Sequence, residues 1–212
     1  MTSLRCALIG ADTLLIECAE MLRARGHKIV SVAASSDRVS AWAEQHDVPS
    51  LDVSSNGTDA LDEWADTLRQ NSVEYTFAIT HLRLLPANVV GAALRMTINF
   101  HDGPLPGYAG RNTPAWGILR GETEWGVTWH QVDAGIDTGD VLVQRRFEIA
   151  ERETSLSLNT RNFEEALDSF AEVLDQLENG NIKPVVQRGE TTLFRSYERP
   201  DEIGRASCRE RV

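Results

Sequence analysis

The first hundred residues alternate short apolar runs with longer segments of helical spacing. Predicted strands cover residues 4–9, 29–34, 49–53, 75–80 and 96–101, and predicted helices cover residues 13–25, 37–46, 59–70 and 86–93. Strands joined by helices need crossover connections, which make the strands parallel and place helices on both faces of the sheet. We therefore predict an α/β fold, with a Rossmann-like, doubly wound, mostly parallel sheet.

The pattern changes after residue 101. Residues 126–132 and 141–149 alternate apolar and polar positions, as half-exposed antiparallel strands do, and a turn-rich loop of residues 133–140 joins them. Three further elements complete the prediction: a short helix at 114–120, a long helix from Thr154 or Ser155 to about residue 179, and a last short strand at 184–187. We expect an antiparallel extension of the sheet and a long C-terminal helix.

Composition narrows the function classes. A chain of 212 residues with 42% hydrophobic residues suits one globular domain. Its net charge of −11, with no basic block, weighs against a nucleic-acid partner. No apolar run approaches the length of a membrane span, and no signal peptide is evident, so we expect no membrane partner and a cytoplasmic protein. Sparse cysteines (Cys6, Cys18, Cys208) agree with a reducing compartment.

The strand at 96–101 ends in a candidate reaction centre. Asn99 and His101 lie two residues apart and therefore share one face of a strand. A carboxamide can donate to a polarised carbonyl oxygen, and an imidazole can take a proton near neutral pH. Asp137, between Gly135 and Gly139, supplies a carboxylate that can orient the imidazole. The three groups suit acyl transfer to an amine, whereas Asn99 and His101 alone would be read as a buried polar pair.

Other chemistries have weaker support in the sequence. No serine or cysteine stands in a nucleophile motif, so a covalent acyl-enzyme is not expected. The five histidines show no paired ligand spacing, and we expect no metal. The turn at residues 10–13 lacks the glycine spacing of a dinucleotide site and is interpreted as structural. We interpret three histidines as surface or packing residues: His27, His46 and His130.

Several motifs occur in a fixed order: Asn99-Phe-His101, the turn at 104–110, Gly121-Glu, Gly126-Val-Thr, and the loop 133–140. Together they resemble the formyltransferases that use 10-formyltetrahydrofolate, over residues 4–190. The resemblance implies a Rossmann-like core, 10-formyltetrahydrofolate as formyl donor, and a catalytic trio of Asn99, His101 and Asp137. Residues 137–144 and 191–194 resemble most the formylation domain of nonribosomal peptide synthetases.

The same resemblance implies which residues contact the folate. One segment follows a strand at the sheet's carboxyl edge, and the other is the loop after residue 131. The implied contacts are Arg83, Leu84, Leu85, Val132, Asp133, Ala134, Gly135 and Ile136. For Leu84 and Leu85, an ordinary place in the core is an equal alternative. Asp102 and Gly103 depart from the family's loop and put its hydrogen bonding in question.

The acceptor is expected to be a primary amine, by preference the amino group of an amino acid bound to a carrier protein. A nucleotide-linked amino sugar is the alternative acceptor, and a formyltetrahydrofolate hydrolase or a non-catalytic docking domain are alternative functions. Transfer RNA is disfavoured by the acidic charge. The predicted organisation is a catalytic domain at 1–190, the start of a linker toward downstream synthetase domains at 191–202, and a non-native tail at 203–212.

Overall fold

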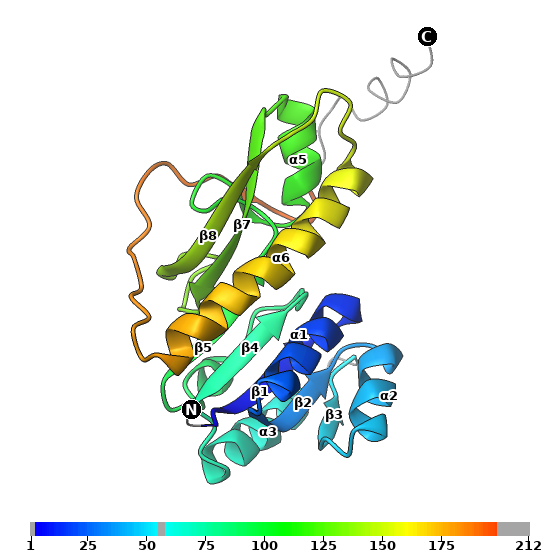
Figure 1. The fold of residues 1–212 in the computed structure, drawn as a ribbon, viewed down its shortest axis with the longest axis vertical. Coiled ribbons are helices and arrows are strands. Elements are labelled where there is room, and N and C mark those ends of the chain that lie inside the picture. The colour runs from blue at the N-terminus through cyan, green and yellow to red at the C-terminus, as the bar shows by residue number, and fades with distance from the viewer. Residues whose placement is uncertain (1–2, 55–57, 199–212) are drawn as a thin grey trace.

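A seven-stranded sheet forms the centre of the protein. The computed structural model describes residues 3–54 and 58–198. The strand order is β3-β2-β1-β4-β5-β7-β8, and a separate pair, β6 and β9, lies outside the large sheet (Figure 1). The strands are β1 (Arg5–Gly10), β2 (Lys28–Ala34), β3 (Ser50–Asp52), β4 (Tyr75–Ile79), β5 (Met96–His101), β6 (Ala109–Gly110), β7 (Glu124–Gln131), β8 (Val141–Glu148) and β9 (Leu193–Phe194).

Helices cover both faces of this sheet. They are α1 (Asp12–Ala24), α2 (Asp37–Gln45), α3 (Thr58–Gln70), α4 (Ala87–Val90), α5 (Thr113–Arg120) and α6 (Ser155–Glu178). The first five strands of the sheet order pair in parallel, and β7 then joins β5 in the antiparallel sense. The predicted fold class, with its antiparallel extension and long C-terminal helix, is therefore confirmed.

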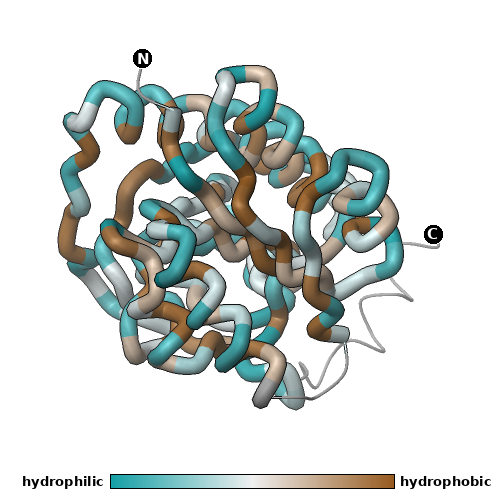
Figure 2. Tube along the Cα trace, turned by 90° about the horizontal axis from the view of Figure 1, so that it is seen from below, coloured by the Kyte–Doolittle hydropathy of each residue, from teal (hydrophilic) through white to brown (hydrophobic). Residues whose placement is uncertain are grey.

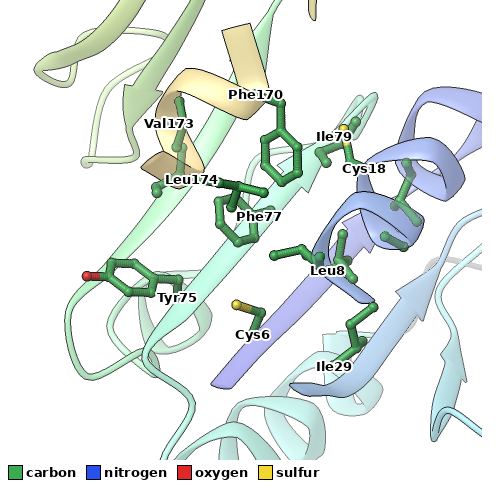
Figure 3. Packing of buried hydrophobic residues seen from close by; sticks show 14 of the residues in the cluster. Cys6, Leu8, Cys18, Ile29, Tyr75, Phe77, Ile79, Phe170, Val173 and Leu174 are labelled. Carbon is green, nitrogen blue, oxygen red and sulfur yellow. The ribbon is translucent and has the colours of Figure 1, made fainter. Parts of the chain in front are cut away.

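Alternation along β1 builds two separate hydrophobic layers. Cys6 and Leu8 face one side of the sheet, where they pack with Phe77 of β4 against α1 and α6. Figure 3 shows these side chains beneath Phe170 and its neighbours on α6. The rings of Phe77 and Phe170 meet edge to face, with centroids 5.2 Å apart. Period-two alternation on a strand thus ties the first strand to a helix that follows about 150 residues later.

The opposite layer lies under α3 and α4. Ala7 and Ile9 of β1 point into it, together with Trp64 and Leu68 of α3. Small side chains on the strands leave room for the Trp64 indole, whose Nε1 donates to Ser31 Oγ at 2.9 Å. In Figure 2 the strands that cross the middle carry hydrophobic segments, and many peripheral turns are hydrophilic. Both faces of the parallel strands are therefore buried, as expected for a doubly wound sheet.

A third cluster supports the antiparallel end of the molecule. It contains Tyr108, Trp125, Leu158 and Phe194, and all four side chains are buried. Phe194 belongs to the segment after α6, residues 181–198, which we call the closing segment. In Figure 1 this segment leaves the end of α6, passes along the β8 side and returns toward α5.

The closing segment differs from the prediction. The strand expected at 184–187 is wrong as an extended element, because only Val185 forms a bridge there, with Val141. The parallel pair of β6 and β9 was not predicted. β9, at residues 193–194, lies beyond residue 190, where the catalytic domain was predicted to end. That domain boundary stays a prediction. The tail predicted as non-native, residues 203–212, lies outside the described residues.

Candidate active site

A cavity of about 940 Å³ opens beyond the carboxyl ends of β1, β4 and β5. Parallel strands bring their carboxyl ends to one edge of the sheet, and in open α/β sheets that edge is the usual place for ligands. Asn99, His101 and Asp137 all line this cavity, as the sequence predicted. His130 lines it as well. The last residues of β5 and the end of β7 thus meet at one wall.

Asn99 is held by His130 on the neighbouring strand. The two residues are register partners between β5 and β7, and Asn99 Nδ2 lies 3.1 Å from His130 Nε2. His130 Nδ1 lies 2.9 Å from the backbone oxygen of Gln131, so Nδ1 carries the proton and donates. In the neutral ring Nε2 then accepts from the amide of Asn99. The second hydrogen on the same amide nitrogen can donate into the cavity that Asn99 lines.

His101 is fixed by the turn that follows its strand. Its Nε2 lies 2.5 Å from the backbone oxygen of Tyr108, and a carbonyl oxygen can only accept, so Nε2 carries the proton. In the neutral ring Nδ1 is therefore the basic nitrogen. Nδ1 lies 3.5 Å from Asp137 Oδ2. A side chain at position 103 would stand 3.0 Å from Nε2, so Gly103 allows the turn to close over the ring.

Asp137 connects both imidazoles. Its Oδ2 accepts from the backbone N–H of Gly110 at 2.8 Å, and its Oδ1 lies 3.4 Å from His130 Nε2. Burial raises the pKa of Asp137, but the interactions with His130, the charge of His101 and the N–H of Gly110 outweigh burial and lower it to about 2. The carboxylate is therefore ionised at neutral pH and can stabilise a positively charged imidazole or ammonium group.

The loop that carries Asp137 has an unusual backbone. Asp137 adopts a φ of +54°, in the left-handed region that costs energy for a residue other than glycine. A side chain at position 139 would stand 1.8 Å from the backbone oxygen of Gln131, so Gly139 permits a close approach of two chain segments. The turn is also fixed by Asp133, whose Oδ1 accepts from Thr138 Oγ1 at 2.7 Å.

Apolar side chains stand open at the cavity wall. Leu84 is 71% exposed and lines the cavity, so the core alternative is wrong for this residue. Leu85 also lines the cavity and packs against the core under α3. Arg83 lines it too, and its guanidinium donates to the backbone oxygen of Ser54 at 2.9 Å. Ile136, on the facing loop, is 40% exposed.

The loop of residues 132–136 lies largely at the cavity wall. Val132, Asp133, Gly135 and Ile136 line the cavity, and Ala134 does not. A flat ring system needs apolar walls and a few fixed backbone donors and acceptors. The folate contacts that the resemblance implies at these positions stay a prediction.

His81 stands at the same edge without a hydrogen-bond partner on either ring nitrogen. It lines the cavity just after β4. Burial, reinforced by the positive charge of Arg83, lowers the pKa of His81 to about 4. The ring is therefore neutral at physiological pH and adds an uncharged wall to the cavity.

A polar groove of about 340 Å³ continues from the cavity. Both share Asp102, Gly110, Arg111 and Asn159 among their lining residues. Asp102 is one of the two departures from the family's loop, and its Oδ1 accepts from Thr113 Oγ1 at 2.9 Å, which ties the loop to the start of α5. The groove extends the cavity along the first residues of α5 and α6.

The interpretation of His130 as a surface or packing residue is wrong. Its side chain is buried, and it contacts both Asn99 and Asp137. The sequence around residue 130 does not indicate these contacts, because they depend on the register between β5 and β7.

Within residues 3–54 and 58–198, no group of three or more histidine, cysteine or acidic side chains could hold a metal ion. Within the same ranges, no helix is long and apolar enough to cross a membrane.

Comparisons with known proteins agree with this geometry. The family model described as "Formyl transferase" matches residues 4–174. Methionyl-tRNA formyltransferase of Anaeromyxobacter dehalogenans (strain 2CP-C) is 32% identical over 211 residues, which cover 93% of this chain and 67% of that protein. The chain therefore spans about two thirds of the length of this relative.

Solved structures share the fold. Glycinamide ribonucleotide transformylase 1 from Symbiobacterium toebii superposes with a TM-score of 0.76 at 18% identity, covering 88% of this chain and 95% of that one. An N-formyltransferase from Helicobacter canadensis, in complex with folinic acid and dTDP-3-aminofucose, gives a TM-score of 0.75 at 20% identity, covering 94% and 73% of the two chains.

Proposed function

The chain belongs to the formyl transferase family, and we propose that it moves the formyl group of 10-formyltetrahydrofolate to the amino group of an amino acid bound to a carrier protein. As a member of this family it is a formyltransferase, and the formylated folate supplies the one-carbon group. The observation that carries the proposal is the meeting of Asn99, His101 and Asp137 at one cavity wall.

Each of these side chains takes one role. Asn99, oriented by His130, donates a hydrogen bond to the formyl oxygen, where negative charge develops during transfer. His101 presents Nδ1 to the reacting atoms, and Asp137 stabilises the ring once it is protonated. Overall, the acceptor nitrogen gains a bond to the formyl carbon and loses one proton, and the donor nitrogen takes up one proton as its own bond to that carbon breaks.

The donor site is assigned to two segments. We assign Arg83, Leu84, Leu85, Val132, Asp133, Gly135 and Ile136 to folate contacts, because they line the cavity. Ala134 belongs to the same loop but does not line the cavity, so we do not assign it a folate contact. The exposed faces of Leu84 and Ile136 offer an apolar wall for a flat ring.

Charge and shape support the choice of acceptor. The chain has a net charge of −11, which opposes the approach of a polyanion. Asp12, the first residue of α1, also lines the cavity, so a carboxylate stands where a helix N-terminus would otherwise favour a phosphate. We place the arm that delivers the amine in the smaller groove beside Asp102, which adjoins the cavity that His101 lines.

Two other acceptors have specific observations in their favour. Transfer RNA is supported by the 32% identity to a methionyl-tRNA formyltransferase. A nucleotide-linked amino sugar is supported by the similarity to the structure that contains dTDP-3-aminofucose. The charge of the chain and the position of Asp12 favour the carrier-bound amino acid over both.

The deciding experiment supplies 10-formyltetrahydrofolate and a panel of amines to the purified protein. The panel contains aminoacyl thioesters of pantetheine, a nucleotide-linked amino sugar and methionyl-transfer RNA, and products are identified by mass spectrometry. We expect formylation of the thioesters. Formylation of the amino sugar or of the transfer RNA, without the thioesters, would reject the proposed acceptor. Release of formate without any acceptor would indicate a hydrolase, and folate binding without turnover would indicate a docking domain.

A further inference from the structure

The closing segment contacts the catalytic loop through one side chain. Gln187 Nε2 donates to the backbone oxygens of Asp137 and Gly139, at 2.8 Å and 2.7 Å. Both hydrogens of one amide nitrogen are therefore committed to the turn that carries the catalytic carboxylate. Residues 183–190 all lie within the described chain, and Gln187 is the only one of them that is not exposed. The segment is thus anchored to this turn by Gln187.

The turn needs such an anchor because its backbone is strained. Asp137 is held at a φ of +54°, in the left-handed region that is less favourable for a residue with a Cβ. A strained residue keeps its conformation only where its surroundings fix it. Hydrogen bonds at the carbonyls of Asp137 and Gly139 fix the peptide plane between Asp137 and Thr138 and the plane that follows Gly139. Gln187 therefore opposes relaxation of the turn.

The same segment also fixes the other partner of the carboxylate. The N–H of Gly110 donates to Asp137 Oδ2, and Gly110 belongs to β6, which pairs with β9 of the closing segment. Arg111 N donates to the backbone oxygen of Phe194 at 2.8 Å. Phe194 is buried between Tyr108 and Trp116, with ring centroids at 5.3 Å and 5.0 Å. The donor to the carboxylate is thus set in place by a strand that follows α6.

We propose that Gln187 is a positioning residue for catalysis, and that the closing segment is an integral part of the active site although it lies beyond residue 174, where the family match ends. Gln187 fixes the backbone of Asp137, and β9 fixes the N–H that binds its carboxylate. The inference rests on the proposed function for its kinetic consequence. Its structural consequence, the place of the Asp137 carboxylate, can be measured separately.

The deciding test is NMR of the Gly110 amide, compared between the wild-type protein and Gln187→Met. An amide proton that donates to a carboxylate reports on that bond through its chemical shift and its pH titration. In the wild type the resonance is expected downfield and constant between pH 7 and pH 4, because Asp137 stays ionised there. In Gln187→Met we expect an upfield shift at pH 7 and a titration that begins at higher pH.

A matched control and a second variant complete the design. Gln70→Met changes an exposed glutamine at the end of α3 and should leave the Gly110 resonance unchanged. Gln187→Glu keeps the shape of the side chain but turns its donor into an acceptor facing two carbonyl oxygens, so it should disturb Gly110 at least as much. It carries the same test if Gln187→Met does not fold, as judged by circular dichroism. An unchanged Gly110 titration in a folded Gln187 variant would overturn the proposal.

Kinetics separate this inference from the proposed function. A misplaced carboxylate should lower kcat about 10-fold or more, while KM for 10-formyltetrahydrofolate and binding of folinic acid stay within about twofold. If the wild type neither binds folinic acid nor turns over the donor, the proposed function fails, and the NMR comparison still decides the role of Gln187. A change in KM alone would place Gln187 in folate binding and contradict the proposal.

Discussion

The two halves of the large sheet reach their structure by different routes. In the parallel half, β3-β2-β1-β4-β5, a single helix joins the strands of every neighbouring pair except β1 and β4. In the second half, β7 and β8 are joined by a loop, and their site is completed by a segment that comes after the longest helix. The first half supplies Asn99 and His101, and the second supplies His130 and Asp137.

The two halves are therefore expected to contribute differently: the parallel half mainly to the stability of the fold, and the second half mainly to turnover. Leu8 and Phe77 of the parallel half are fully buried in the largest cluster. In the second half, residues far apart in the chain contact one short loop: Gly110, His130 and Gln187 all contact the turn that carries Asp137. We therefore expect core substitutions in the first half to act mainly on folding, and substitutions in the second half to act mainly on turnover.

The largest expected effect tests whether the two halves act as one site. Asn99→Ala, from β5, and Asp137→Asn, from the second half, should each lower kcat by at least about 10²-fold, since each removes charge stabilisation from the transition state. The double variant should fall little further than the worse single variant, because the residues act together. Steady-state kinetics measure this, with Asp66→Asn on the exposed face of α3 as control. Fully multiplicative losses would show two independent contributions instead.

A matched pair of core substitutions sharpens the comparison. Leu8→Ala should lower the free energy of unfolding by about 3 kcal/mol, because it leaves a cavity in the core, and kcat of the folded protein should stay the same. Phe194→Ala should cost about 2 kcal/mol, since the closing segment can open locally, and should lower kcat. Urea unfolding and kinetics of the same preparations measure both quantities. The reverse pattern, with catalysis lost in Leu8→Ala alone, would break the distinction.

A smaller effect comes from His81, at the edge of the parallel half. Its pKa of about 4 in the folded protein lies below the ordinary value of 6.5, so between these pH values the unfolded chain binds a proton that the folded protein does not. Stability should therefore fall as pH drops from 6.5 toward 4. Between pH 7 and pH 5 the wild type should lose about 1.5 kcal/mol more than His81→Phe, measured by urea unfolding. Equal losses would mean that the ring is hydrated.

The smallest effect belongs to Asp137, in a separate pH window. Its folded pKa of about 2 lies below the ordinary value of 3.8, so its stabilising contribution is complete above pH 4 and is lost as pH falls toward 2. The stability difference between the wild type and Asp137→Asn should shrink by about 1 kcal/mol between pH 6 and pH 3. A constant difference over this range would show that Asp137 is not ionised in the way that its contacts require.

The sequence predicted what depends on local periodicity. Alternation on strands places Asn99 and His101 on one face, and the alternation of strands with helices indicates that this half of the sheet is parallel. The glycines that flank Asp137 indicate room for a ligand, but at Gly139 it is the backbone oxygen of Gln131 that approaches closely. These features follow from neighbours within a few residues, which is the range over which period and turn chemistry carry information.

The remainder depends on contacts between residues far apart in the chain. His130 meets Asn99 only because β5 and β7 pair in one particular register, and a shift by one residue would turn the ring to the other face. β6 and β9 contain two residues each, too few for any periodic signal. Gln187 stands among exposed residues, so nothing in its surroundings indicates a contact 50 positions earlier in the chain.

The position of the closing segment has a consequence for synthesis of the protein. A ribosome releases the chain from its N-terminus, so all seven strands of the large sheet have emerged once residue 148 is outside. Gln187 and Phe194 follow only after α6, and the contacts that fix Asp137 form last. A nascent chain thus forms the large sheet first, and we expect no formyl transfer before residues 187–194 have left the ribosome.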